Sequence, residues 1–173
     1  MNSADQKVKT GNLPAEWLNG VSSALSDNRP PAALVFLPEH IEEQRAIYPS
    51  ELTYVVKNMR SEGVDAAFLD APKGRAFRSK FSADATPVVI GILLSVLSNG
   101  IYDLLKVSFA LLRAEAKKRP GSTATLRTLI YESSEGAPVF SQEFTGPEQD
   151  ALALAEKQIE AFLREQHDIR SGN

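Results

Sequence analysis

The residues best suited to acid–base chemistry are a histidine and carboxylates that follow two apolar runs of the chain. Glu39 and His40 follow the run from Ala32 to Leu37, and Asp70 follows the run from Val64 to Leu69. An imidazole exchanges protons near neutral pH and a carboxylate can orient it, so these three residues are candidates for general acid–base catalysis. Loops also carry polar side chains that have no catalytic task. We therefore expect His40 to have no pocket around it and no carboxylate within hydrogen-bonding distance.

A basic cluster comes next in the chain, in the segment KGRAFRSK. Its members, which are candidates for binding an anion or a phosphate, are Lys73, Arg75, Arg78 and Lys80. Phe77 lies among them and could stack on a base. The net charge of −3, however, provides no positive field that would attract nucleic acid. The pattern favours a solvated connection and argues against a nucleic-acid partner.

Composition narrows the remaining chemistry. The chain has no cysteine, and its two histidines, His40 and His167, lie far apart in the sequence. No metal-binding spacing, glycine-rich phosphate loop or nucleophile elbow occurs, so we expect no metal and no cofactor. The first residues, MNSADQKVKTGN, are polar and do not form a secretory signal, which predicts a cytoplasmic protein.

The order of predicted elements indicates an α/β (or α+β) fold. The two apolar runs are typical of strands buried on both faces, and the segment from Pro49 to Gly63 between them has helical spacing. Strand, helix and strand in this order predict a βαβ crossover with parallel strands. Leu126–Glu132 and Pro138–Phe144 flank a glycine-containing turn, which predicts a hairpin. We expect a small mixed sheet of about four strands packed by helices. Residues 1–12 are expected to be a flexible tail and residues 13–170 a single globular domain.

The most apolar part of the chain is the segment from Pro87 to Leu112, which contains only two charged residues, Asp103 and Lys106. We predict one continuous helix from about Ala85 to Lys118. Polar and small residues recur along it at four- and three-residue spacing and would form one stripe on the helix. The members of this polar stripe are Gly91, Ser95, Asn99, Asp103 and Lys106.

Three interpretations of this apolar helix stay open. It could be a central core helix whose stripe meets water. It could mediate self-association, because small residues four apart allow a second helix to approach closely. It could also meet a membrane, with the flanking basic residues at the headgroups.

These observations favour a non-enzymatic interaction or regulatory protein that self-associates or binds a protein partner. One alternative is a membrane-acting effector that uses residues 87–112 and is membrane-associated. The other is a small nucleotide- or glycoside-processing hydrolase with its site at the carboxyl ends of the strands, where open parallel sheets bind ligands.

Overall fold

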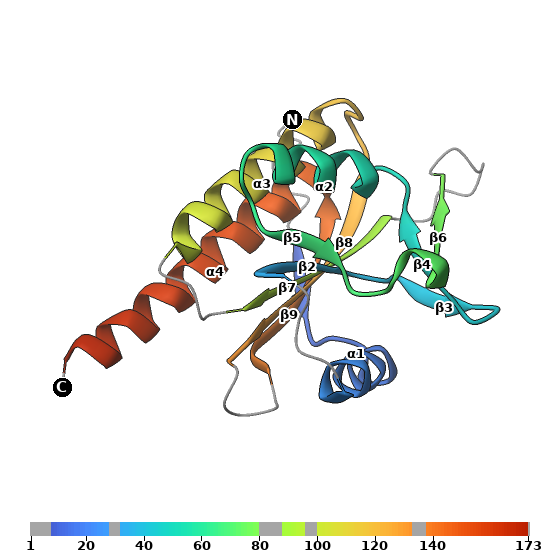
Figure 1. Cartoon of the computed structure of the whole chain (residues 1–173). Helices are drawn as coiled ribbons and strands as arrows, with labels where there is room; N and C mark the ends of the chain where they lie inside the picture. Colours follow the sequence, from blue (N-terminus) through green and yellow to red (C-terminus); the bar gives the residue numbers. More distant parts are fainter. Residues whose placement is uncertain (1–7, 28–31, 80–87, 96–99, 133–137, 173) are drawn as a thin grey trace.

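A computed structural model shows a mixed α/β fold in which helices cover both faces of a central sheet (Figure 1). The structure describes residues 8–27, 32–79, 88–95, 100–132 and 138–172. The helices are α1 (Ala15–Asp27), α2 (Leu52–Ser61), α3 (Ile101–Lys117) and α4 (Glu148–Ser171), and a short 3-10 turn is η2 (Pro72–Gly74). The strands are β1 (Lys9–Gly11), β2 (Leu34–Leu37), β3 (His40–Glu42), β4 (Arg45–Pro49), β5 (Ala66–Phe68), β6 (Arg75–Arg78), β7 (Val88–Ser95), β8 (Thr123–Tyr131) and β9 (Pro138–Pro147).

The central sheet has six strands in the order β1-β9-β8-β7-β2-β5. β2 and β5 are adjacent and parallel, with Leu34 opposite Ala66, which confirms the predicted pairing of the two apolar runs. β8 and β9 form the predicted hairpin. The α/β class is therefore confirmed, although the sheet is larger than the expected four strands. Its edge strand β1 lies within the segment expected to be a tail, because backbone hydrogen bonds to β9 need no apolar side chain.

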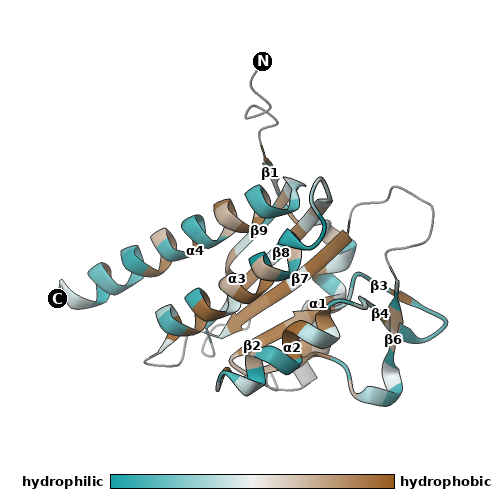
Figure 2. Cartoon of the chain, turned by 90° about the horizontal axis from the view of Figure 1, so that it is seen from above, coloured by the Kyte–Doolittle hydropathy of each residue, from teal (hydrophilic) through white to brown (hydrophobic). Residues whose placement is uncertain are grey.

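The two faces of this sheet are covered unequally. Side chains alternate along β2, so that Leu34 and Phe36 pack in the core formed with α2, α3 and α4. Val35 and Leu37 point to the other face, where they join a smaller cluster with residues of α1. Figure 2 shows β2 and β7 as strongly apolar strands, and Figure 1 shows them between α1 and the other three helices. Three helices therefore cover one face of the central sheet, whereas α1 alone covers the opposite face.

A second, three-stranded sheet in the order β3-β4-β6 lies beside the first. β3 and β4 form a hairpin whose two turn residues, Glu43 and Gln44, both have positive φ, at 48° and 66°. β6 pairs with β4 in parallel. The sequence pattern does not predict this sheet, because its strands have only three to five residues and β3 is largely exposed.

The predicted continuous helix over residues 85–118 is wrong. Val88–Ser95 is strand β7, and the helix begins only at Ile101. β7 lies between β2 and β8, so its apolar side chains are buried on both faces of the sheet. A short apolar run with several β-branched residues suits such a strand as well as it suits a buried helix.

The polar stripe consequently does not exist as one surface. Gly91 and Ser95 lie on β7, whereas Asp103 and Lys106 are exposed on α3. Asn99 lies outside the described residues. Because the stripe was drawn on a helix of 3.6 residues per turn, the change to a strand separates its members. Within the described ranges, no helix is both long enough and apolar enough to cross a membrane.

Candidate functional site

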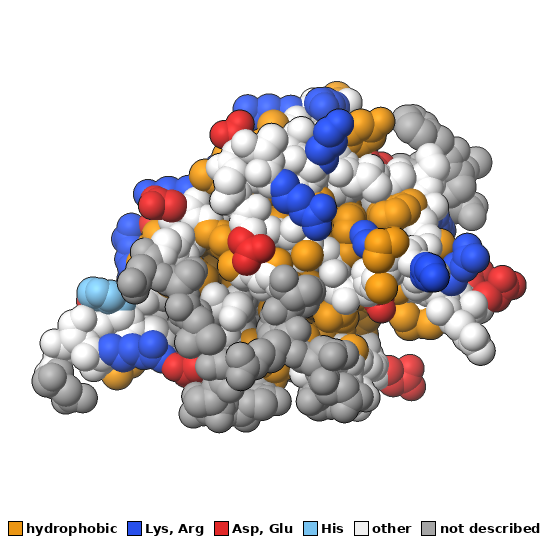
Figure 3. Space-filling view, in the orientation of Figure 1, with side chains coloured by type: hydrophobic (Ala, Val, Ile, Leu, Met, Phe, Trp, Pro, Cys, Tyr) orange, Lys and Arg blue, Asp and Glu red, His pale blue; other side chains and the backbone are white. Residues whose placement is uncertain are grey.

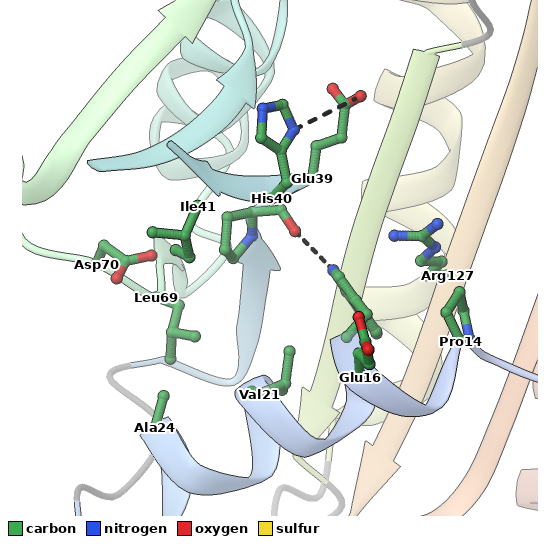
Figure 4. A pocket seen from close by; sticks show the side chains of 13 residues that line it. Pro14, Glu16, Val21, Ala24, Glu39, His40, Ile41, Leu69, Asp70 and Arg127 are labelled. Atoms are coloured by element: carbon green, nitrogen blue, oxygen red, sulfur yellow. Dashed lines mark hydrogen bonds and ion pairs between the residues drawn. The ribbon is translucent and has the colours of Figure 1, made fainter. Parts of the chain in front are cut away.

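A cleft of about 450 Å³ lies between α1 and the carboxyl ends of β2 and β5, and we name it the α1 cleft (Figure 4). It lies at the edge of the sheet where parallel strands end, which is where open α/β sheets commonly bind ligands. Its walls are formed by Pro14, Glu16, Trp17, Gly20, Val21 and Ala24 at α1, by Pro38, Glu39, His40 and Ile41 after β2, by Leu69 and Asp70 after β5, and by Arg127 of β8.

Trp17 anchors α1 to the sheet at the base of the α1 cleft. Its indole Nε1–H donates a hydrogen bond of 2.9 Å to the backbone oxygen of Pro38, directly after β2. On the sheet below, Gly91 leaves room for the indole, because a Cβ at Gly91 would lie 3.1 Å from the Trp17 ring and 2.7 Å from the Cβ of Leu37. The helix can therefore approach closely at this point, and the indole is fixed in the wall of the cleft.

Arg127 also contacts this indole. Its guanidinium carbon lies 5.2 Å from the Trp17 ring centre, within the range of a cation–π contact. Its Nε donates a hydrogen bond of 3.0 Å to Glu143 on the neighbouring strand β9. The positive charge of Arg127 is thus balanced by a carboxylate of the protein itself.

Asp70 is held from the core side of the small sheet. The hydroxyl of Tyr48, whose side chain is fully buried, donates a hydrogen bond of 2.6 Å to Oδ2 of Asp70. Burial, followed by this hydrogen bond, raises the pKa of the Tyr48 phenol far above its usual value. Tyr48 therefore stays a proton donor, and Asp70 stays fixed in orientation.

The expectation that His40 would have no pocket and no nearby carboxylate is wrong. His40 lines the α1 cleft together with Glu39 and Asp70, and its Nε2 lies 3.4 Å from Oε2 of Glu42. The reason is that the segment after β2 continues into strand β3, whose first residues line the cleft opposite α1. Figure 4 nevertheless shows the side chains of His40 and Glu39 pointing toward each other and away from α1, with His40 Nδ1 3.9 Å from Glu39 Oε1.

Asp70 does not orient the imidazole of His40 in this structure. The Asp70 carboxylate contacts Tyr48 rather than the imidazole, and the side chain of His40 is 40% exposed. Among the described residues, no serine or threonine hydroxyl is hydrogen-bonded to His40 that would serve as a nucleophile.

The candidate anion-binding residues do not converge either. Arg75 and Arg78 are three apart on β6 and so lie on opposite faces of that strand. Arg75 lies over the ring of Phe68 at 4.7 Å, whereas Arg78 approaches Glu39 at 4.0 Å. Lys73 is exposed on η2, and Lys80 lies outside the described residues.

The sequence located one wall of the α1 cleft and missed the other. Glu39, His40 and Asp70 were expected at one edge of the sheet because they follow parallel strands. Trp17 and Arg127 were not expected there, because the order of predicted elements does not show that α1 and β8 meet this edge of the sheet. The single tryptophan on a short helix was a usable signal, because indole N–H groups need a partner when they are buried.

Comparisons with known proteins give no match to this chain, whether with protein-family models, curated proteins or solved structures. The geometry of the α1 cleft is therefore the basis for a functional interpretation.

Proposed function

We propose that this chain is a non-enzymatic interaction protein and that a partner protein inserts an apolar side chain into the α1 cleft. The observation that carries the proposal is the cleft itself, whose walls are mainly apolar and whose volume of about 450 Å³ lies in the range of ligand-binding pockets. Apolar surface of this kind gains free energy when a partner removes it from water.

The rim of the α1 cleft supports a protein partner over a small molecule. Ile41 lines the cleft and is 63% exposed, so the apolar surface continues beyond the cavity onto strand β3. In the described three-stranded sheet, β3 is an edge strand that pairs only with β4. Figure 3 shows further hydrophobic side chains beside charged ones at the end of the molecule that carries this small sheet. A partner that covers both the cleft and Ile41 buries more apolar surface than a ligand that fills the cavity alone.

Gly20 allows a direct experiment. It lines the α1 cleft on an exposed turn of α1, and no atom lies within 4 Å of a Cβ built there. Gly20→Phe should therefore fill the cleft without disturbing the fold, and Gly20→Ala is its matched control. A random peptide library displayed on phage is selected on wild-type protein and then compared on the two variants. We expect a shared apolar motif that Gly20→Ala retains and Gly20→Phe loses. A motif that binds Gly20→Phe equally well, or the absence of any motif, contradicts the proposal.

A second candidate function is a small hydrolase, because the α1 cleft brings Glu39, His40 and Asp70 to the carboxyl ends of parallel strands. In that case nucleotides or aryl glycosides would be turned over, and His40→Ala would abolish turnover at unchanged thermal stability. Our proposal expects no turnover of either substrate class by the wild-type protein.

A further inference from the structure

We infer that the segment bound in the α1 cleft is basic: it carries Lys or Arg residues on both sides of an apolar side chain, and these reach Asp70 and Glu16. This inference rests on the proposed function and specifies its partner. Figure 4 places Asp70 and Glu16 on opposite sides of the cleft, with Ile41, Leu69 and Val21 between them.

Asp70 is an available and oriented carboxylate. It accepts a hydrogen bond from Tyr48, and it forms no ion pair with any described residue. A hydrogen bond from a neutral hydroxyl leaves the carboxylate its negative charge and further lone pairs. Because Tyr48 is fully buried and cannot move away, Asp70 is held in place before a ligand arrives, which lowers the entropy cost of binding.

Glu16 is the second available carboxylate. It lies in the first turn of α1, is exposed, and has no ion-pair partner in the described part of the chain. The other charged groups of the cleft are already matched within the protein. Arg127 is paired with Glu143, and Glu39 lies near both His40 and Arg78.

The charge balance of the α1 cleft is therefore negative. Glu16 and Asp70 contribute two unpaired negative charges, whereas the one arginine in the lining is neutralised by Glu143. A segment with Lys or Arg beside its apolar anchor complements this pattern. An acidic or phosphorylated segment would place like charges together and is disfavoured.

Three synthetic peptides test the inference: acetyl-Lys-Leu-Leu-Lys-amide and its counterparts with Gln or Glu in place of both lysines. Trp17 is the only tryptophan of the chain and lines the cleft, so its emission reports binding there. We expect the Lys peptide to bind about tenfold or more tightly than the Glu peptide, and the difference to shrink as salt is raised.

The variants Asp70→Asn and Glu16→Gln should each weaken binding of the Lys peptide by up to about fivefold while leaving the Gln peptide unaffected. Tyr48→Phe should weaken the Lys peptide in the same way, because Asp70 loses its orientation. Glu165→Gln, on an exposed position of α4, removes the same charge elsewhere and should change nothing. Thermal unfolding of each variant verifies that it is folded.

The outcomes separate this inference from the proposed function. Equal binding of the Lys and Glu peptides, or no saturable response of Trp17 to the Lys peptide, overturns the inference. The proposed function fails separately, if the phage selection yields no motif that is sensitive to Gly20→Phe.

Discussion

Gly91 determines how closely α1 can lie against the sheet, because the Trp17 ring and Leu37 fill the space that a side chain at this position would occupy. Gly91→Ala should lower the free energy of unfolding by about 1–3 kcal/mol, because the added methyl has no room in a packed core. Gly20→Ala is the control, as Gly20 is an exposed helical glycine with open space around it. It should raise stability by about 0.5–1 kcal/mol. Urea unfolding measures both, and equal effects of the two substitutions would contradict the close-packing argument.

Because the phenol of Tyr48 is buried, we expect the protein to lose stability at alkaline pH. Burial and the hydrogen bond to Asp70 raise the pKa of its phenol in the folded protein above the usual value of about 10. At pH values below about 10, the Tyr48 phenol is protonated in both the folded and the unfolded protein, so it does not change the free energy of unfolding. Above this pH only the unfolded chain ionises, so Tyr48 lowers the free energy of unfolding by about 1.4 kcal/mol per pH unit. Unfolding measured on both sides of this pH should show a smaller decline for Tyr48→Phe. Tyr54→Phe, at a position 66% exposed, should decline like wild type; the reverse order would contradict this assignment.

At the residue level, the sequence could predict only the part of the site that depends on strand order. The sequence predicts that Glu39, His40 and Asp70 lie at one edge of the sheet, because they come after two strands that are parallel. It does not predict the directions of their side chains, because these depend on β3, on the partner of Tyr48 and on the position of α1. Those contacts join residues far apart in the chain, such as Trp17 with Pro38 and Tyr48 with Asp70.

At the level of elements, the β3–β4 hairpin has an unusual turn. Type I′ geometry needs positive φ at both turn residues and normally uses Asn-Gly, but this chain has Glu43 and Gln44 there. Gln44→Gly should raise the free energy of unfolding by about 1 kcal/mol, because glycine adopts this conformation without a steric penalty. Gln44→Ala should bring no such gain. Chemical denaturation of the three proteins decides the point, and a destabilised Gln44→Gly would show that the turn conformation is incorrect.

The segment of residues 87–112 was predicted wrongly because a strand and a helix were taken as one element. The runs of β2 and β5 were short and bounded by proline or glycine, so they were identified as strands. The run after Pro87 is separated from the apolar residues of α3 only by Ser98, Asn99 and Gly100, a turn-forming sequence that the prediction of one continuous helix passed over. What distinguishes β7 is its partners β2 and β8, which are contributed by distant parts of the chain.

At the scale of the whole molecule, the fold buries one face of its sheet under three helices and the other under α1 alone. The small cluster beneath α1 leaves the end of that face uncovered, and the β3–β4 hairpin rises beside it to complete the α1 cleft. The α/β class followed from the periodicity of the sequence. The unequal layers did not, because they depend on which side of the sheet each helix crosses.

The most direct test of the account follows the indole N–H resonance of Trp17 in isotope-labelled protein. The chain has one tryptophan, and its Nε1–H contacts Pro38 within the wall of the α1 cleft, so the signal is unique and local. We predict that titration with acetyl-Lys-Leu-Leu-Lys-amide shifts this resonance and the amides of His40 and Ile41, while those of α4 stay in place. If the shifts occur on α3 or α4 and the indole resonance does not move, the α1 cleft is not the binding site.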